Sequence, residues 1–347
     1  MPDKTVYFLG AGASAGSDFN LPVMKGFFRE EDFTGNGVYK NLRDYISSFR
    51  PKTELEDINL EELITHLELT SEGFNWGLFD PKLHETKIEL YDYIRFRLGD
   101  PLEKKIGSVD ENGSSRHCQK HLEFIEKLNP DNDSIISLNY DLIVDNILEI
   151  FLTKKTTPEN NFNKFWQRYE NLLRMPTVWG APPITQHIGD KGKGVYVKLH
   201  GSLDWLYCPS QDCPHNRCFN RGLDPKEPCF HCGTGIETAI VPPTMKKSFE
   251  KFPKLGFLWH VAFNKLKEAD KIVVIGMSFP NSDYYLKWLV RQAMMVRRKT
   301  KPLELVIVNI DNASFEETVK KTEEIFMVCA SGIIKGGLKG YTDKIKE

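Results

Sequence analysis

Three residues that can accept, donate or direct protons stand immediately after apolar runs of the sequence. Asn139 and Asp141 follow the run at residues 134–138, and His200 follows the run at 196–199. Open α/β sheets bind their ligands at the carboxyl ends of their strands. An imidazole, with an ordinary pKa of about 6.5, accepts a proton at near-neutral pH. This pattern predicts a catalytic site in which His200 acts as a general base.

Each of these residues also has a purely structural interpretation. Asn139 or Asp141 can cap a helix that begins near Leu142, because either side chain accepts hydrogen bonds from the first turn. A single histidine beside a glycine is often a buried, hydrogen-bonded residue. The expected position of His200 at the same sheet edge as the other polar residues favours catalysis.

A glycine-rich turn follows the first apolar run, at residues 6–9. The turn reads Gly10, Ala11, Gly12, Ala13, Ser14, and a helix is expected to open near Ala13. Such a strand, turn and helix can hold the pyrophosphate of a nucleotide. The dinucleotide fingerprint requires a third glycine and a later acidic residue, and neither fits here. The alternative is a tight turn needed only for packing of the strand on the helix.

Five of the seven cysteines lie between Cys208 and Cys232. The two-residue spacing of Cys229 and Cys232 lets both thiolates face one tetrahedral zinc ion. The favoured ligand set adds Cys208 and Cys213, and Cys218 is the rival for either of these two places. A closed four-thiolate site would be structural. An iron–sulfur cluster or free thiols are the alternatives.

Strand patterns alternate with helical ones outside residues 17–130, which predicts an α/β fold with a doubly wound parallel sheet. Further strands at 271–275 and 305–308 end at Gly276, Ser278 and Asn309. Residues 17–130 read as a helical insertion. Its carboxylate-rich stretch at 54–62 is interpreted as a solvated helix face. The end of the chain, from Gly336, reads as a short polar tail.

Bulk composition excludes several classes of protein. Hydrophobic residues make up 40% and charged residues 27% of the 347 residues, which is typical of a globular protein. A net charge of -2 gives no electrostatic reason to expect direct nucleic-acid binding. No apolar run approaches the roughly 20 residues of a membrane helix, and the chain leads directly into its first strand. A cytoplasmic location without membrane association is expected.

The order of these motifs resembles the Sir2 (sirtuin) family, and in particular its bacterial SIR2-like branch of NAD+ hydrolases found in anti-phage defence. The resemblance covers most of the chain. It is carried by residues 10–14, Asn20-Leu21-Pro22, residues 137–141, residues 198–201, the cysteines, residues 275–278 through Ser282 and Asp283, and Val308-Asn309.

The resemblance implies three parts and a role for each motif. A Rossmann-like NAD-binding catalytic domain would comprise 1–16, 131–205 and 240–340, with the helical insertion at 17–130 and a structural zinc module at 206–239. NAD+ would be the substrate. The implied contacts are Gly10, Ala11 and Gly12 with the pyrophosphate, Ser14 with phosphate or ribose, Asn139, Asp141 and His200 with the nicotinamide ribose, and Gly276, Ser278 and Asn309 with adenosine.

Two departures from protein-deacylase sirtuins bear on the acceptor. The chain has Val23, Met24 and Lys25 after Pro22, and it has prolines in the segment 240–244 that would have to pair with a peptide. Water is therefore the expected nucleophile. The alternatives are a deacylase or ADP-ribosyltransferase, and a non-catalytic sensor of NAD+ or ADP-ribose. The defence role implies restraint by homo-oligomerisation or by a separate activating partner, such as an ATPase or a nucleic-acid-guided protein.

Overall fold

The structure is a computed structural model. It describes residues 3–19, 21–23, 26–34, 37–72, 81–99, 118–153, 161–174, 193–221, 227–241, 252–297, 302–310 and 312–345. Asn20, Met24, Lys25 and the segment 242–244, which entered the sequence comparison above, lie outside the described residues.

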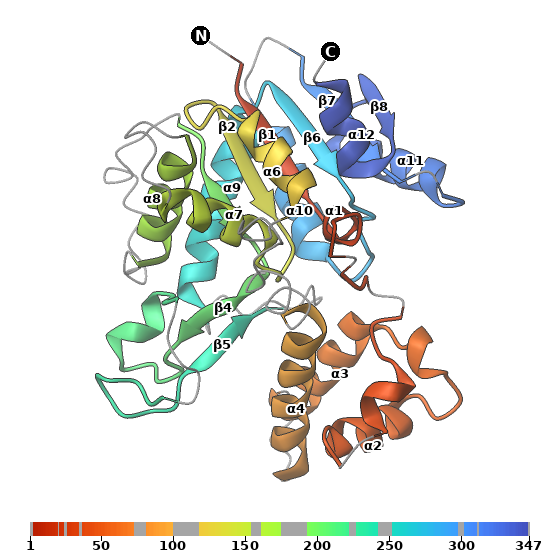
Figure 1. The fold of residues 1–347 in the computed structure, drawn as a ribbon, viewed down its shortest axis with the longest axis vertical. Coiled ribbons are helices and arrows are strands. Elements are labelled where there is room, and N and C mark those ends of the chain that lie inside the picture. Colours follow the sequence, from red (N-terminus) through yellow and green to blue (C-terminus); the bar gives the residue numbers. More distant parts are fainter. Residues whose placement is uncertain are drawn as a thin grey trace, which may run out of the picture.

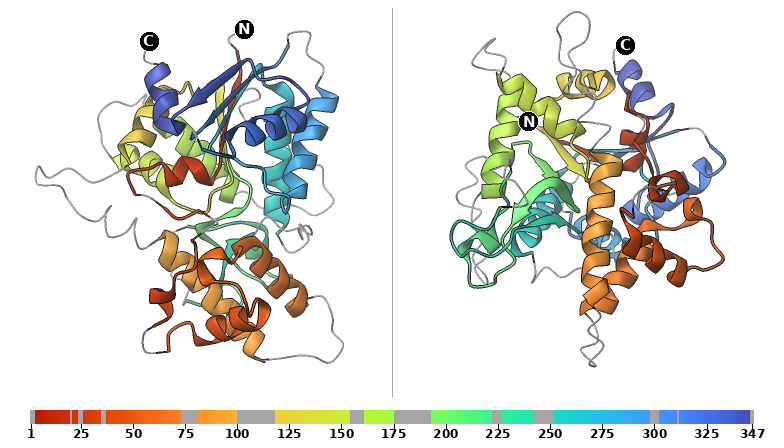
Figure 2. Two further views of the ribbon diagram at one scale, coloured as in Figure 1. Left: turned by 90° about the vertical axis from the view of Figure 1, so that its right-hand side faces the viewer. Right: turned by 60° about the horizontal axis from the view of Figure 1, so that its bottom comes forward.

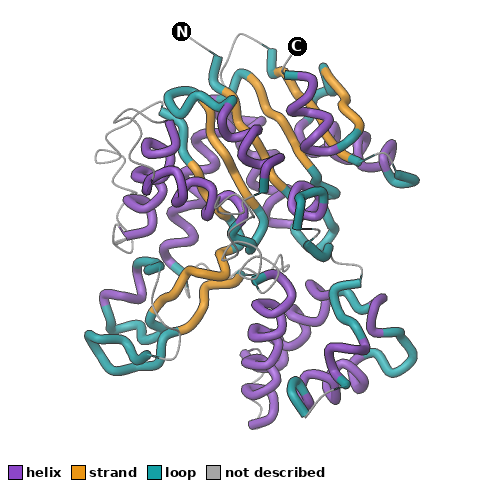
Figure 3. Tube along the Cα trace, viewed as in Figure 1, coloured by secondary structure: helices purple, strands orange, loops and turns teal. Residues whose placement is uncertain are grey.

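A six-stranded parallel sheet forms the centre of the molecule (Figure 1, Figure 3). Its strands are β1 (Thr5–Leu9), β2 (Asp133–Ser137), β3 (Tyr196–Lys198), β6 (Lys271–Ile275), β7 (Glu304–Asn309) and β8 (Gly332–Lys335). Their order is β3-β2-β1-β6-β7-β8, so the chain reverses direction across the sheet between β1 and β6. This is the order of dinucleotide-binding Rossmann sheets. The predicted α/β, doubly wound fold is confirmed.

Helices cover both faces of this sheet. Tyr7 and Phe8 are adjacent in β1 and therefore point to opposite faces. The ring of Tyr7 contacts Phe124 of α6 (Gln119–Glu126) and Tyr341 of α12 (Gly337–Lys344), whereas Phe8 contacts Phe326 of α11 (Phe315–Phe326). Strands β1 and β2 are buried along their whole length, which explains why they read as continuous apolar runs.

The remaining helices of this part pack beside these. Helices α9 (Pro253–Glu268) and α10 (Tyr284–Val296) pack together, and α10 also contacts α11. Helices α7 (Ile143–Thr153) and α8 (Asn161–Arg174) form a second pair, with α8 against β3. Among the described residues, no helix combines the length and the apolar character needed to cross a bilayer.

The local structure differs from the sequence-based expectations at three places. The tail from Gly336 is helix α12, and its lysines are exposed while Leu338 and Tyr341 are buried against the sheet layer. The high glycine and lysine content of this segment led to the prediction of a polar tail, although its apolar residues have helical spacing. Strand β8 was not predicted, because its four residues are only partly buried at the sheet edge. The helix of the glycine turn, α1 (Ala11–Ala15), opens two residues earlier than Ala13.

A helical module lies below the carboxyl ends of the strands (Figure 1, Figure 2). It contains η1 (Glu30–Phe33), α2 (Lys40–Phe49), η2 (Leu55–Asp57), α3 (Leu60–Glu72) and α4 (Pro81–Leu98). Its core is built on Tyr93, whose ring stacks on Phe28 at 5.3 Å and on Phe33 at 5.2 Å. Helix α6 falls inside the predicted insertion range but packs against the sheet. The exact domain boundaries remain a prediction.

The cysteine-rich segment forms a separate small module. It contains the antiparallel pair β4 (Gly201–Tyr207) and β5 (Glu237–Ile240), with η3 (Pro214–Arg217) between them in sequence. Figure 1 shows this module on the same side of the sheet as the helical module. The catalytic residues predicted from the sequence therefore lie at the edge from which both modules extend.

The buried His121 in α6 predicts a pH dependence of stability. Its Nδ1 lies 3.1 Å from the Cys118 sulfur, and burial lowers its pKa to about 4. The unfolded chain, with a histidine pKa of about 6.5, binds the proton more readily, so acid favours unfolding between these two values. This group should remove about 3 kcal/mol of stability between pH 7 and pH 4. Urea unfolding of His121→Asn should show a correspondingly smaller acid loss, and parallel pH curves for the two proteins would contradict the assignment.

Candidate active site

The glycine turn after β1 packs against the turn after β6, at the point where the strand order reverses. The amide of Gly10 donates to the carbonyl of Ile275 at 2.9 Å, and that of Gly12 donates to the carbonyl of Gly276 at 2.8 Å. Gly276 has φ +65°, and a Cβ there would lie 2.2 Å from the Ala13 nitrogen. The glycines thus have a packing role, as the alternative interpretation required. Ala11 is nevertheless exposed, so the outer side of the turn is accessible.

Asn139, Ser14 and Asp141 form one hydrogen-bonded chain. The Asn139 amide nitrogen Nδ2 donates to the Gly10 carbonyl at 3.0 Å and to Ser14 Oγ at 2.8 Å. Ser14 Oγ in turn donates to Asp141 Oδ2 at 2.6 Å. The loop after β2 is thereby bound to the loop after β1. Because both Nδ2 protons are used, Asn139 Oδ1 is the atom left to accept a hydrogen bond from a ligand.

Asp141 combines this contact with a structural one. Its Oδ1 accepts a hydrogen bond from the amide of Ile143, the first residue of α7, at 3.0 Å. The expected helix-start role therefore applies to Asp141. Burial raises the pKa of this carboxyl, although Lys198 and the Ser14 hydroxyl favour the charged form.

His200 is buried in the turn between β3 and β4. Its ring lies 6.4 Å from the Tyr140 ring and stacks at 6.5 Å on Trp259 of α9, measured between centroids. The next residue, Gly201, has φ +86°, and a Cβ there would lie 1.8 Å from the Ala239 carbonyl oxygen. A glycine after His200 is therefore required by the close approach of β5. The turn holds the imidazole against the loop that carries Asn139 and Asp141.

A buried lysine connects the loops after β2 and β3. Lys198 Nζ, fully buried, donates to the Asp141 carbonyl at 2.7 Å and to Ser202 Oγ at 2.6 Å, and it forms an ion pair with Asp145 Oδ2 at 3.1 Å. Asp145 also accepts hydrogen bonds from the hydroxyls of Tyr169 and Tyr196. Burial alone would raise the pKa of Asp145, but Lys198 and Arg221 outweigh burial and lower it.

Asp145 was not predicted to have a role, and Lys198 stood out in the sequence only as part of a motif. A usable signal was present: a lysine inside an apolar strand run needs a buried partner. The sequence could not identify that partner as Asp145, because the two residues are 53 positions apart.

The residues predicted to receive the adenosine half of the nucleotide lie at the same edge. Ser278 is exposed just after β6. Asn309, at the end of β7, donates from Nδ2 to the Met277 carbonyl at 3.3 Å. The neighbouring loops are thus joined, and the contact of these residues with a ligand remains a prediction.

One carboxylate of the helical module reaches this edge. Glu61, at the start of α3, is 7% exposed and accepts a hydrogen bond from Ser282 Oγ in the loop after β6. The interpretation of residues 54–62 as a solvated face was therefore wrong for Glu61. It holds for Glu54, Glu56, Asp57 and Glu62, which are exposed.

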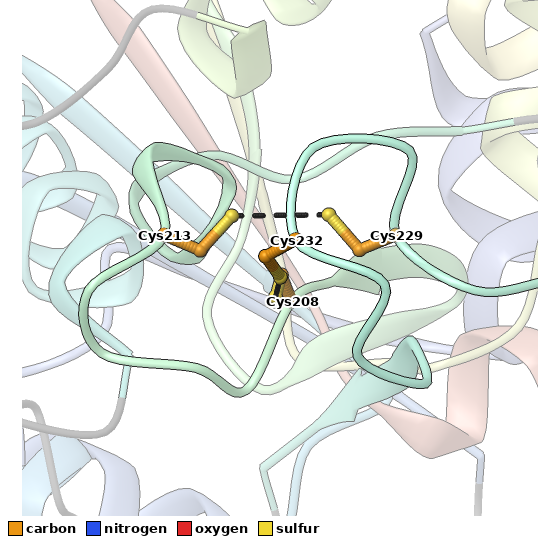
Figure 4. Close-up of side chains that lie close together, drawn as sticks. All are labelled: Cys208, Cys213, Cys229 and Cys232. Atoms are coloured by element: carbon orange, nitrogen blue, oxygen red, sulfur yellow. Dashed lines mark hydrogen bonds between the residues drawn. The ribbon is translucent and has the colours of Figure 1, made fainter.

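Four cysteines converge in the small module (Figure 4). The sulfur atoms of Cys208, Cys213, Cys229 and Cys232 all lie within 4.8 Å of one another. The sulfurs of Cys208 and Cys232 are 3.4 Å apart, and those of Cys213 and Cys229 are 3.8 Å apart. A tetrahedral site with zinc–sulfur bonds of about 2.3 Å needs sulfur atoms about 3.8 Å apart. The cluster can therefore hold zinc, as expected from the favoured ligand set.

Cys218, the rival ligand, lies outside the cluster. Its sulfur is 4.0 Å from Asn220 Nδ2 and 4.0 Å from the His215 carbonyl oxygen. We predict that the purified protein contains about one zinc ion per chain, that Cys229→Ser loses it, and that Cys218→Ser retains it. Metal analysis by mass spectrometry checks this, with Cys329→Ser as the control for an exposed thiol. Loss of zinc from Cys218→Ser but not from Cys213→Ser would contradict the assigned ligands.

Comparison with known proteins gives only distant structural matches. No protein-family model and no curated protein matches the sequence. A substituted Sir2 homologue in complex with ADP-ribose aligns with a TM-score of 0.46 at 14% identity, over 99% of this chain and 90% of that chain. A Sir2 homologue bound to NAD aligns with a TM-score of 0.45 at 14% identity, over 99% and 88%. Sir2 with an inhibitor, 2′-O-acetyl-ADP-ribose and a deacetylated peptide aligns with a TM-score of 0.39 at 13% identity, over 99% and 92%.

Proposed function

We propose that this protein binds NAD+ at the carboxyl edge of its sheet and hydrolyses the bond between nicotinamide and ribose. The observation that carries the proposal is the position of the buried His200 against Tyr140, in the loop whose Asn139 and Asp141 form the Asn139–Ser14–Asp141 chain at the glycine turn. A sheet with this strand order binds nucleotides where the order reverses. The sequence resemblance to Sir2 proteins selects NAD+ among the dinucleotides.

The reaction would need little acid catalysis. Nicotinamide leaves as a neutral pyridine when its bond to C1′ breaks, and the electron pair of that bond returns to the ring. The protein's task is to stabilise the positive charge that develops on the ribose and to place a nucleophile. Water attacks C1′, His200 accepts its proton, and ADP-ribose results. Asn139 Oδ1 would orient the water or a ribose hydroxyl.

A cysteine-bound zinc ion would support this chemistry indirectly. With all four positions filled by thiolates, zinc would leave no coordination place for substrate or water. Its contribution would be to hold the small module that follows the β3–β4 turn and His200. Cys208 directly follows the end of β4, and the other three cysteines lie in the loops between β4 and β5.

The molecule that accepts the ADP-ribosyl group distinguishes the candidate functions, and it can be measured directly. Purified protein should be incubated with NAD+, and nicotinamide and ADP-ribose followed by chromatography. Hydrolysis predicts equal amounts of both products without an added acceptor. A deacylase or ADP-ribosyltransferase instead predicts that NAD+ consumption depends on an acyl-lysine peptide or another acceptor. A sensor predicts binding without turnover.

We also propose that the activity is restrained until the protein assembles, with itself or with an activating partner, as anti-phage defence would require. NAD+ is essential to the cell, so an unrestrained hydrolase would harm its host. The assay should therefore span a wide range of protein concentration, with scattering measured on the same samples. A fully active monomer would count against this restraint.

A further inference from the structure

Asp283 lies beside His200 and has no role in the mechanism given above. It is the residue before α10, in the loop that leads from β6. Its Oδ2 lies 3.0 Å from His200 Nε2, and the two side chains are 2% and 5% exposed. Its Oδ1 accepts a hydrogen bond from the amide of Leu286 at 3.3 Å and so caps α10. One carboxylate therefore contacts both the imidazole and a helix terminus.

Asp283 Oδ2 and His200 Nε2 are close enough for an ion pair, but the two groups are not aligned well enough to form a good hydrogen bond. Such catalytic contacts often tighten only when substrate is bound. The helix cap fixes Asp283 from one side. On the other side, its neighbour Ser282 donates to Glu61 of the helical module. Both ends of the short segment are thus anchored next to the imidazole.

Two aromatic side chains and one carboxylate of the described residues face the His200 imidazole. Tyr140 and Trp259 face its ring, and Asp283 faces Nε2. Burial raises the pKa of Tyr140 well above its ordinary value, and the charges of Glu61, Asp283 and Glu68 raise it further. Tyr140 is therefore neutral at physiological pH. Asp283 is the carboxylate within ion-pair distance of the imidazole.

We propose that Asp283 is the positioning residue of His200. It holds the orientation of the imidazole and stabilises the imidazolium that forms when His200 accepts a proton. The proposal rests on the proposed function, in which His200 is the general base. A neighbouring negative charge favours the protonated form of a histidine and raises its pKa. Removing that charge should therefore weaken the base and disorder its ring.

The helix cap makes a sharp experiment possible. Asparagine and serine cap helices about as well as aspartate, so Asp283→Asn and Asp283→Ser should both keep α10 intact. Asparagine can still contact the imidazole without a charge, whereas serine is too short to reach it. We expect kcat to fall on the order of 10- to 100-fold in both variants, with the larger loss in Asp283→Ser. The affinity for NAD+ should change little.

The pH profile separates positioning from a structural role. In Asp283→Asn the acidic limb of kcat/KM should move to lower pH by about one unit or more, because His200 loses the charge that favours its protonated form. Titration of the His200 imidazole by NMR, assigned with His200→Gln, should show the same shift in protein without ligand. Asp270→Asn is the control, since this carboxylate binds the Lys4 amide at the other end of β6. It should leave the titration unchanged.

The outcomes distinguish this inference from the proposed function. A wild-type protein that never cleaves NAD+ would overturn the proposed function, and the NMR titration would still test the pairing. An active wild type in which Asp283→Asn keeps both its pH profile and its His200 titration would overturn the inference. If Asp283→Asn does not fold, the same measurements on Asp283→Ser decide it.

Discussion

His200→Ala should lose NAD+ turnover by between about 10² and 10⁴-fold, while its affinity for NAD+ stays close to that of the wild type. The reason is that the imidazole would accept a proton only as the nucleophile attacks. It would contribute little to holding the ground-state substrate. The glycine turn and the Asn139–Ser14–Asp141 chain, which would bind the dinucleotide, do not depend on it for their hydrogen bonds.

Turnover and affinity should be measured separately for this variant. Nicotinamide release gives the rate, and calorimetry with NAD+ gives the dissociation constant. His66→Ala is the matched control, because His66 is exposed in the helical module and hydrogen-bonds Tyr45. It should retain full turnover. Equal activity in His200→Ala and the wild type would remove His200 from the mechanism.

Lys198→Ala should destabilise the folded protein by about 3–5 kcal/mol. The substitution leaves Asp145 as a buried charge without its main counter-ion. It also removes the donor to the Asp141 carbonyl and to Ser202. The effect should reach the active site as well, because these contacts hold the loop that carries Asn139 against the turn that carries His200.

Urea unfolding of the two proteins measures this cost. Lys271→Ala is the control: Lys271 pairs with Glu304 at 2.6 Å in the same sheet, but both side chains are partly exposed. An exposed pair contributes about 0–1 kcal/mol. Equal stability of the two lysine variants would contradict the stabilising role assigned to the buried contacts of Lys198. Adding Asp145→Asn to Lys198→Ala should recover part of the loss.

Much of the sheet could be predicted from the sequence because its signal is local. Parallel strands buried on both faces appear as continuous apolar runs, and for this reason all five predicted strands lie within one residue of their observed bounds. The polar residues after those runs are brought to one edge because the strands are parallel. This is why Asn139, Asp141 and His200 could be nominated before any contact was known.

The contacts between distant segments could not be predicted in the same way. Glu61 and Ser282 are 221 positions apart, and periodicity alone places Glu61 in a run of carboxylates whose other members are exposed. Asp283 looks like an ordinary helix cap in sequence. Only the folded chain shows that its second oxygen faces His200. Local sequence patterns therefore predict secondary structure and the residues at strand ends, whereas they do not predict which distant segment a side chain contacts.

The cysteine set illustrates an intermediate case. The spacing of Cys229 and Cys232 identified half of the site, because two residues between ligands suit one tetrahedral ion. Cys208 and Cys213 were the favoured partners, and Cys218 remained the rival for either place. The path of the loop between them turns Cys218 toward Asn220 and brings the other two to the cluster.

NAD+ cleavage by the purified wild-type protein, measured with and without an acyl-lysine peptide, tests the central claim most directly. The expected result is equimolar release of nicotinamide and ADP-ribose at a rate that the peptide does not change, in at least one assembly state of the protein. Release only in the presence of peptide, with formation of acyl-ADP-ribose, would contradict the claim, as would the absence of release from every assembled or partner-activated form.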